Sequence, residues 1–187
     1  MAQQPKLTVS GYRGIWGETL TAEIAQRYAC AFACFVQETR NTHPTLLIAR
    51  DGRESGLEIK HAIIETLISK GIQVIDGDIL PTPTVLFAVR TEKYDGAIII
   101  TASHNPIEYN GLKFVTHTAL FTNEDEVANI QKRYGENKNT ETIEKGTVTE
   151  NTTLGQEHIS EIITHINSEK IRARKFKVAV DMINASA

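Results

Sequence analysis

The sequence predicts a three-layer α/β/α domain with a mostly parallel, mixed β-sheet, followed by the truncated start of a second, similar domain. Short continuous runs of apolar residues alternate with longer segments whose apolar residues recur every three or four positions. Continuous runs are typical of strands that helices cover on both faces, and the longer period is typical of amphipathic helices. Their alternation favours strands connected by helices in one sheet.

Three apolar runs are expected to form buried strands, at residues 45–49, 72–75 and 97–100. A further extended segment is expected at residues 111–115. Alternation along that segment would place Leu112 and Phe114 on one face of the sheet and Lys113 on the other.

Four helices are expected before, between and after these strands. Thr21 is a candidate N-cap for the first, and Ser55 with Glu58 has the spacing of a capping box for the second. In the third, Thr82 would be the N-cap and Pro83 the first helical residue. The fourth would start near Asn123 and Glu126. The apolar stripes that define these helices are Ile24, Tyr28, Phe32 and Phe35/Val36; Ile59, Ile63 and Leu67; Val85, Leu86 and Val89; and Val127, Ile130 and Tyr134.

The composition changes after Tyr134, so residues 1–134 are expected to form the first domain. Between residues 135 and 153 the large apolar residues are Ile143 and Val148, which indicates a polar linker or exposed excursion. A helix with four inward isoleucines is then expected, followed by a buried strand at residues 176–180. One helix and one strand cannot close a core, so residues 154–187 are interpreted as the incomplete start of a second domain.

The composition restricts the possible partners. The chain has 187 residues, of which 41% are hydrophobic and 23% charged, and a net charge of −3. This balance gives no reason to expect nucleic acid or an anionic membrane as a partner. No apolar run approaches the ~20 residues that span a bilayer, and no signal peptide is recognisable. We read Cys30 and Cys34 as buried apolar residues of a cytosolic protein.

The segment Thr-Ala-Ser-His-Asn-Pro at residues 101–106 directly follows the most apolar strand. Ligands of open α/β sheets bind at the carboxyl ends of strands. Pro106 restrains the residue before it, so the Ser103 hydroxyl could be presented at the sheet edge, with His104 beside it and Lys113 further on. Composition alone leaves an ordinary polar turn as the alternative.

The order of residues in and after this segment is more specific than its composition. Residues 101–106, followed by Glu-Tyr-Asn-Gly-Leu-Lys-Phe at 108–114, closely resemble the active-site serine segment of the α-D-phosphohexomutases. That superfamily includes phosphoglucomutase, phosphomannomutase and phosphoglucosamine mutase. Residues 10–14, 49–56, 77–84 and 178–184 resemble further segments of the family, in the family's order. Two departures are the missing aspartate before the arginine loop at 10–14 and the missing glycines at 184–187.

The resemblance implies that Ser103 carries a phosphoryl group and donates it to a hexose monophosphate, so that a hexose bisphosphate forms. It implies that Arg13 contacts phosphate, and that His104 and Lys113 stabilise charge or move protons beside the transferring group. It also implies a Mg²⁺ ion held by the phosphate on Ser103 and by three aspartates of a second-domain loop that this chain lacks. For Arg50 and Arg53, a structural role and a substrate contact both stay open.

Three functions remain on these grounds. The chain would be the N-terminal, phosphoserine-bearing part of a phosphohexomutase that interconverts hexose 1- and 6-phosphates, and it would be inactive alone. It could instead be a non-catalytic phosphosugar-binding or regulatory module. A hydrolase that uses Ser103 and His104 is disfavoured because no Gly-x-Ser-x-Gly elbow surrounds the serine.

Overall fold

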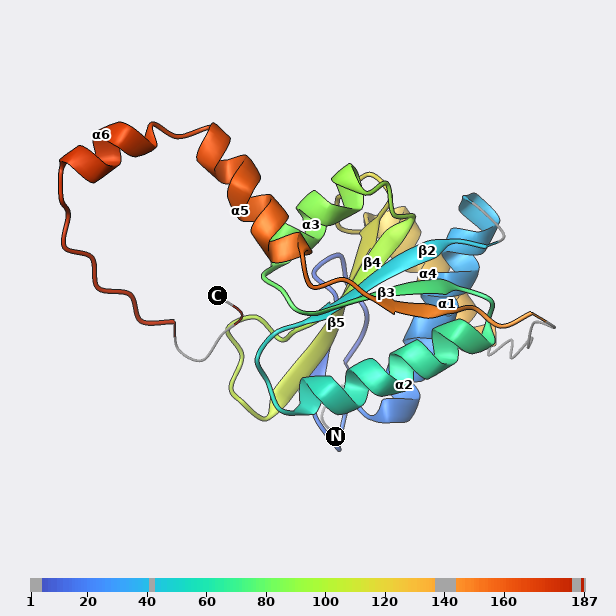
Figure 1. Ribbon diagram of the computed structural model, residues 1–187. Helices are drawn as coiled ribbons and strands as arrows, with labels where there is room; N and C mark the ends of the chain where they lie inside the picture. Colours follow the sequence, from blue (N-terminus) through green and yellow to red (C-terminus); the bar gives the residue numbers. More distant parts are fainter. Residues whose placement is uncertain (1–4, 41–42, 137–143, 183–185, 187) are drawn as a thin grey trace.

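The computed structural model describes residues 5–40, 43–136, 144–182 and 186, so Ile143 of the expected linker and Asn184 of the last resembling segment lie outside it. One six-stranded sheet has helices on both faces (Figure 1). The strand order is β1-β5-β4-β2-β3-β6. Their bounds are Tyr12–Ile15 for β1, Thr45–Arg50 for β2, Gln73–Ile79 for β3, Gly96–Ile100 for β4, Tyr109–Thr116 for β5 and Val148–Glu150 for β6.

The pairing confirms a mixed and mostly parallel sheet. Strand β2 is parallel to both β3 and β4, and β3 is parallel to β6. Strand β5 returns antiparallel to β4 and also pairs antiparallel with β1. Strand β1 was not expected as a strand, because its four residues, with Gly14 after Arg13, are too few to show an apolar period.

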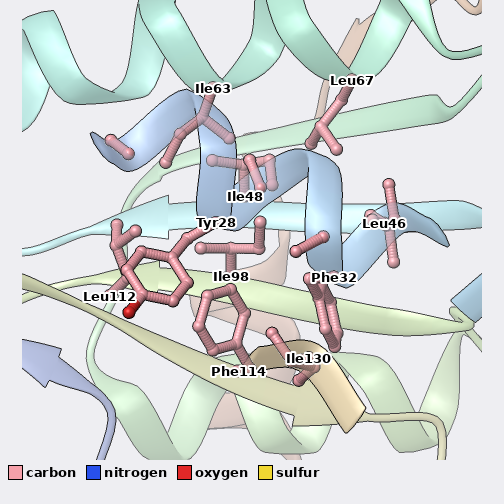
Figure 2. Close-up of a cluster of buried hydrophobic side chains, with 14 of the residues drawn as sticks. Tyr28, Phe32, Leu46, Ile48, Ile63, Leu67, Ile98, Leu112, Phe114 and Ile130 are labelled. Atoms are coloured by element: carbon pink, nitrogen blue, oxygen red, sulfur yellow. The ribbon is translucent and has the colours of Figure 1, made fainter. Parts of the chain in front are cut away.

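Three helices cover one face of the sheet: α1 (Ala22–Thr39), α2 (Ser55–Ser69) and α4 (Glu124–Glu136). The predicted stripes point inward, and Phe32, Ile63 and Leu67 are fully buried. Figure 2 shows the Phe32 ring against Phe114 of β5, with their centroids 4.9 Å apart. Burying such large apolar side chains is the main stabilising contribution to this layer.

The other face is covered by α3 (Thr82–Thr91) and by the start of α5 (Leu154–Thr164). Val85 and Val89 of α3 pack with Leu154 over the strand residues Ile99 and Val115. The two clusters on opposite faces confirm the three-layer arrangement.

Two of the four predicted helix starts are confirmed. Thr21 accepts a hydrogen bond from the amide of Ile24, and Asn123 and Glu126 form a reciprocal capping box. The other two are wrong by one residue. Ser55 is already helical because the chain enters α2 through Glu54 in helical geometry, and Thr82 is the first helical residue after an extended Pro81.

The chain after Tyr134 differs from expectation. Helix α4 continues to Glu136, and the stretch expected as a linker contains β6 at the edge of the sheet. Helix α5 forms, but the isoleucines expected to point inward, Ile159, Ile162 and Ile163 in the helix and Ile166 just after it, are 44–50% exposed. Helix α6 (Ser168–Ala173) follows, and Figure 1 shows this part of the chain leading away from the sheet.

The strand expected at residues 176–180 does not form. Phe176, Val178 and Val180 are exposed and unpaired, since the described part of the chain places no strand beside them to complete the backbone hydrogen bonds. The division into a first domain, a linker and a second-domain start therefore stays a prediction. Among the described residues, no helix is long and apolar enough to cross a membrane.

Candidate functional site

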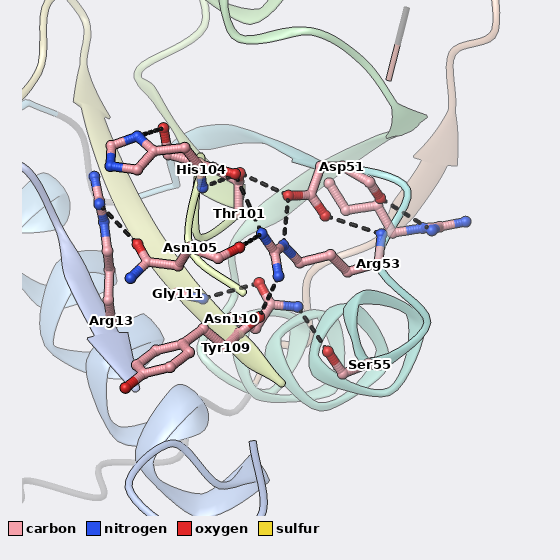
Figure 3. Close-up of polar contacts among 12 residues, drawn as sticks. Arg13, Asp51, Arg53, Ser55, Thr101, His104, Asn105, Tyr109, Asn110 and Gly111 are labelled. Atoms are coloured by element: carbon pink, nitrogen blue, oxygen red, sulfur yellow. Dashed lines mark hydrogen bonds and ion pairs between the residues drawn. The ribbon is translucent and has the colours of Figure 1, made fainter. Parts of the chain in front are cut away.

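The serine loop leaves the carboxyl end of β4 and returns in β5 (Figure 3). Ser103 and His104 are both exposed, and Ser103 has a φ angle of +58°. A left-handed backbone costs a residue with a Cβ about 1–2 kcal/mol, so the surrounding contacts have to hold it. Strand β2 is parallel to β4, so the turn after β2 ends at the same edge of the sheet.

A chain of hydrogen bonds joins that turn to the backbone of Ser103. The Ser103 amide donates to Thr101 Oγ1 at 3.0 Å, and the Thr101 hydroxyl donates to Asp51 Oδ2 at 2.7 Å. The Asp51 amide in turn bonds to the carbonyl of Ile100 in β4. The position of the serine is thus set by β2 and β4 together.

Arg53 binds the same loop from the side. Its Nε donates to Asp51 Oδ2 at 3.3 Å, and the arginine side chain is only 11% exposed. Its two Nη atoms donate, over distances of 2.6–3.2 Å, to the carbonyl oxygens of Ser103, Asn105, Pro106 and Tyr109. Figure 3 shows the guanidinium between Asp51, Asn105 and Tyr109.

Arg50 lies in a separate ionic cluster at the ends of β2 and β3. It donates to Asp78 at 2.9 Å, and the buried Lys60 of α2 bonds to Asp78 at 2.9 Å and to Asp76 at 2.8 Å. Burial alone would raise the pKa of Asp78, but the two cations lower it overall. Burial likewise lowers the pKa of Lys60, and the two carboxylates outweigh this and raise it.

Asn110 fixes the far end of the loop and is fully buried. Its Nδ2 donates to Ser55 Oγ at 2.9 Å, and its Oδ1 accepts from the amide of Gly111 at 2.8 Å. A Cβ at Gly111 would lie 2.3 Å from the carbonyl oxygen of Tyr12. Only glycine therefore lets β1 approach β5 closely at this point.

The register of that close approach places Arg13 directly opposite Gly111. Arg13 is partly buried, and its Nη1 donates to Asn105 Oδ1 at 3.0 Å. The expected arginine loop is therefore a strand that presents its guanidinium to the serine loop.

Lys113 lies on the sheet face opposite to Leu112 and Phe114, as alternation predicted. Burial first, and then the nearby charge of Arg13, lower the pKa of the Lys113 amine. Its Nζ lies 5.1 Å from the centroid of the Phe121 ring. A bound anion between Arg13 and Lys113 would relieve the repulsion of these two cations.

His104 lies beside Ser103, with 3.5 Å between His104 Nδ1 and Ser103 Oγ. This separation is at the outer limit of a hydrogen bond, so the imidazole is near the hydroxyl without activating it strongly. In the described part of the chain, no hydrogen bond joins Ser103 directly to Arg13 or Lys113.

The described residues do not by themselves complete a metal site. They contain no group of three or more His, Cys, Asp or Glu side chains that could hold an ion. Asp51, the nearest carboxylate in this network, already accepts from Thr101 and Arg53. Mg²⁺ prefers carboxylate and phosphate oxygens as ligands, so a magnesium site here would need oxygen ligands beyond those of this network.

The four predicted site residues thus gather around one loop, with Arg13 joined to it through Asn105. Sequence reasoning placed Thr101 in the serine segment without giving it a role of its own, and it gave Asn110 and Ser55 no role in the site. The structure buries Thr101 and Asn110 next to the loop, and a buried polar side chain needs a partner.

Comparison with known proteins identifies the family. The profile described as phosphoglucomutase/phosphomannomutase, alpha/beta/alpha domain I, matches residues 4–141. A phosphoglucosamine/phosphogalactosamine mutase of Sulfurisphaera tokodaii is 32% identical over 94% of this chain and 38% of its own length. A phosphoglucosamine mutase of Pediococcus pentosaceus is 43% identical over 56% of this chain and 24% of its own length.

Among solved structures, a phosphoglucomutase/phosphomannomutase family protein from Burkholderia thailandensis superposes with a TM-score of 0.76 at 29% identity. It covers 89% of this chain, which in turn covers 37% of that protein. The chain spans less than two fifths of the length of these curated relatives. Because the family profile covers most of the described fold, including the serine loop, the chain belongs to the phosphoglucomutase/phosphomannomutase family, the α-D-phosphohexomutases, and contains its domain I.

Proposed function

We propose that this chain is the phosphoserine-bearing part of a phosphohexomutase, which interconverts hexose 1-phosphate and hexose 6-phosphate through a hexose bisphosphate. The observation that carries the proposal is the exposed Ser103, held at the carboxyl end of β4 with Arg13, His104 and Lys113 around its loop. Small hexose phosphates are the partners, and the cytosol is the expected location.

In the forward half of the reaction, a sugar hydroxyl attacks the phosphorus on Ser103. The bond between phosphorus and Ser103 Oγ breaks, the new bond to the sugar oxygen forms, and the sugar's proton leaves. Lys113 is a suitable acceptor because its lowered pKa leaves a larger neutral fraction of the amine than an ordinary lysine has. The second half reverses these steps with the other phosphate of the bisphosphate.

Charge compensation accompanies this transfer. A phosphoserine adds about −1.5 to −2 charges, and Arg13 offers a planar fork that suits phosphate oxygens. Mg²⁺, when bound by the Ser103 phosphate and by aspartates of another domain, would offset charge on the transferring oxygens. Arg13 orients the phosphate, while His104 is placed to exchange a proton with Ser103 Oγ.

A non-catalytic phosphosugar-binding module is the second candidate, because the cations Arg13 and Lys113 could hold a phosphate without any transfer from Ser103. The two candidates differ in the fate of Ser103. A mutase needs a serine that accepts and returns a phosphoryl group, whereas a binding module needs only the side chains that hold the sugar phosphate.

The test is intact-mass measurement of the chain before and after incubation with glucose 1,6-bisphosphate and Mg²⁺. We expect one phosphate group, which Ser103→Ala abolishes and which Ser160→Ala, a control on the exposed side of α5, leaves in place. A chain without phosphate in either state would overturn the assignment of Ser103 as carrier. In a coupled assay with glucose 1-phosphate we expect negligible turnover by the chain alone.

A further inference from the structure

We propose that Arg53 is a positioning residue for the serine loop and not a ligand of the substrate phosphate. This inference rests on the proposed phosphoryl transfer at Ser103. The feature behind it is that one guanidinium group binds the main chain at both ends of the loop.

An arginine side chain has five N–H donors and no acceptor. In Arg53 each of the five has a protein acceptor: Nε donates to Asp51, Nη1 to the carbonyls of Pro106 and Tyr109, and Nη2 to those of Ser103 and Asn105. No donor is left for a phosphate oxygen unless a bond to the loop breaks. Its low exposure of 11% also keeps the guanidinium out of reach of an incoming anion.

The acceptors are main-chain groups, so Arg53 acts on the shape of the loop and not on any one side chain. It holds the carbonyl of Ser103 from one side, while the Thr101 hydroxyl holds the Ser103 amide from the other. Together these bonds keep Ser103 at its φ of +58°, which an unrestrained serine would leave.

Phosphoryl transfer depends mainly on the position of the reacting groups, and a displacement of 1 Å costs about 100-fold in rate. Lysine would keep the positive charge of Arg53 but has a single nitrogen, which cannot reach four carbonyl oxygens in a plane. We therefore expect Arg53→Lys to free the loop although the charge of the site is unchanged.

The first experiment needs no variant and no phosphorylation. In the chain labelled with 15N-arginine, the Nη–H signals of Arg53 should be resolved and slow to exchange. Titration with inorganic phosphate should shift the signals of Arg13 and leave those of Arg53 in place. Shifts of Arg53 equal to those of Arg13 would show that it is a phosphate ligand and would overturn the proposal.

The second experiment measures amide hydrogen exchange in residues 101–109. Arg53→Lys should raise exchange there at least tenfold, while the protection of β2 and β4 stays as in the wild type. Arg90→Lys, an exposed arginine of α3, is the matched control and should change neither. Unchanged protection of the loop in Arg53→Lys would refute a positioning role.

The third experiment is chemical rescue. Arg53→Ala should reduce the rate at which Ser103 gains phosphate from glucose 1,6-bisphosphate by about 100-fold, and added methylguanidinium, but not methylammonium, should restore it. Failure of rescue in a folded variant would count against the guanidinium as the acting group. If the wild type itself takes up no phosphate, the proposed function fails, while the first two experiments still decide the role of Arg53.

Discussion

Replacing Thr101 with valine removes one hydroxyl and keeps the shape of a buried side chain. The hydroxyl joins the turn after β2 to the serine loop, since it donates to Asp51 Oδ2 and accepts from the amide of Ser103. Thr101 is only 8% exposed, and without its hydroxyl Asp51 Oδ2 would lose its 2.7 Å hydrogen bond and keep the one from Arg53 Nε at 3.3 Å. We expect Thr101→Val to destabilise the domain and to loosen Ser103.

The size of the expected loss of stability follows from the two hydrogen bonds of the Thr101 hydroxyl. A hydrogen bond to a charged group contributes about 1.5–3 kcal/mol to stability, and one between neutral groups contributes about 1 kcal/mol. Ser103 is exposed, so water would compensate for most of the second bond. The free energy of unfolding should therefore fall by about 2–3 kcal/mol.

The assay is urea unfolding followed by circular dichroism, with Thr101→Ser as the matched control. The serine variant keeps the hydroxyl and loses one methyl group, which costs about 1 kcal/mol. The denaturant dependence should be the same in all three proteins, since the surface exposed on unfolding is unchanged. If the valine variant loses no more stability than the serine variant, the hydroxyl does not hold the loop and this reasoning is wrong.

Three further substitutions test other parts of the structure. Gly111→Ala should lower the free energy of unfolding by about 1–3 kcal/mol, because a Cβ would meet the carbonyl of Tyr12. Urea unfolding measures this loss, and a variant as stable as the wild type would contradict the close approach of β1 to β5. Lys113→Met should raise the melting temperature at neutral pH, because burial and Arg13 disfavour the protonated amine, whose folded pKa is lowered. Between the lowered folded pKa of Lys113 and 10.5, the unfolded wild-type chain binds more protons than the folded one. The gain in melting temperature of Lys113→Met should therefore shrink as pH rises through this window. A gain that stays constant with pH would refute the role of the protonated amine. Lys60→Met should lower the free energy of unfolding by about 3 kcal/mol at pH 7. Calorimetry should show this difference from wild type shrinking as pH falls through the lowered pKa of Asp78, because the wild type then also loses the Lys60–Asp78 ion pair.

Much of the fold could be predicted because its signals are local. The apolar runs of β2, β3 and β4 and the helical stripes of α1 and α2 follow from burial on both faces of a sheet. Even the direction of Lys113 followed from alternation along β5. In these elements, the residues that the local pattern predicts to be buried are buried in the structure, so tertiary contacts do not overrule the local pattern.

The remaining elements depend on neighbours that a local pattern cannot contain. Strands β1 and β6 have no apolar period of their own and exist because β5 and β3 offer them backbone partners. The run at residues 176–180 is the reverse case, because it has a strong local pattern but the residues that the structure describes place no strand beside it. Ser55 looked like a cap by its spacing, but its hydroxyl accepts a hydrogen bond from Asn110, a residue 55 positions away.

The three arginines near the serine loop show what the structure adds to residue type. By residue type alone Arg13, Arg50 and Arg53 could each hold a phosphate, and only the family resemblance assigned that role to Arg13. In the structure the three differ in how many N–H groups are already engaged. Arg53 uses all five, and Arg50 binds Asp78 and the carbonyl of Asp51. Among the hydrogen bonds of the described residues, Arg13 makes one, to Asn105. An anion at the loop would therefore gain a two-pronged contact from Arg13 without breaking an existing bond, whereas recruiting Arg53 would release the backbone that holds Ser103.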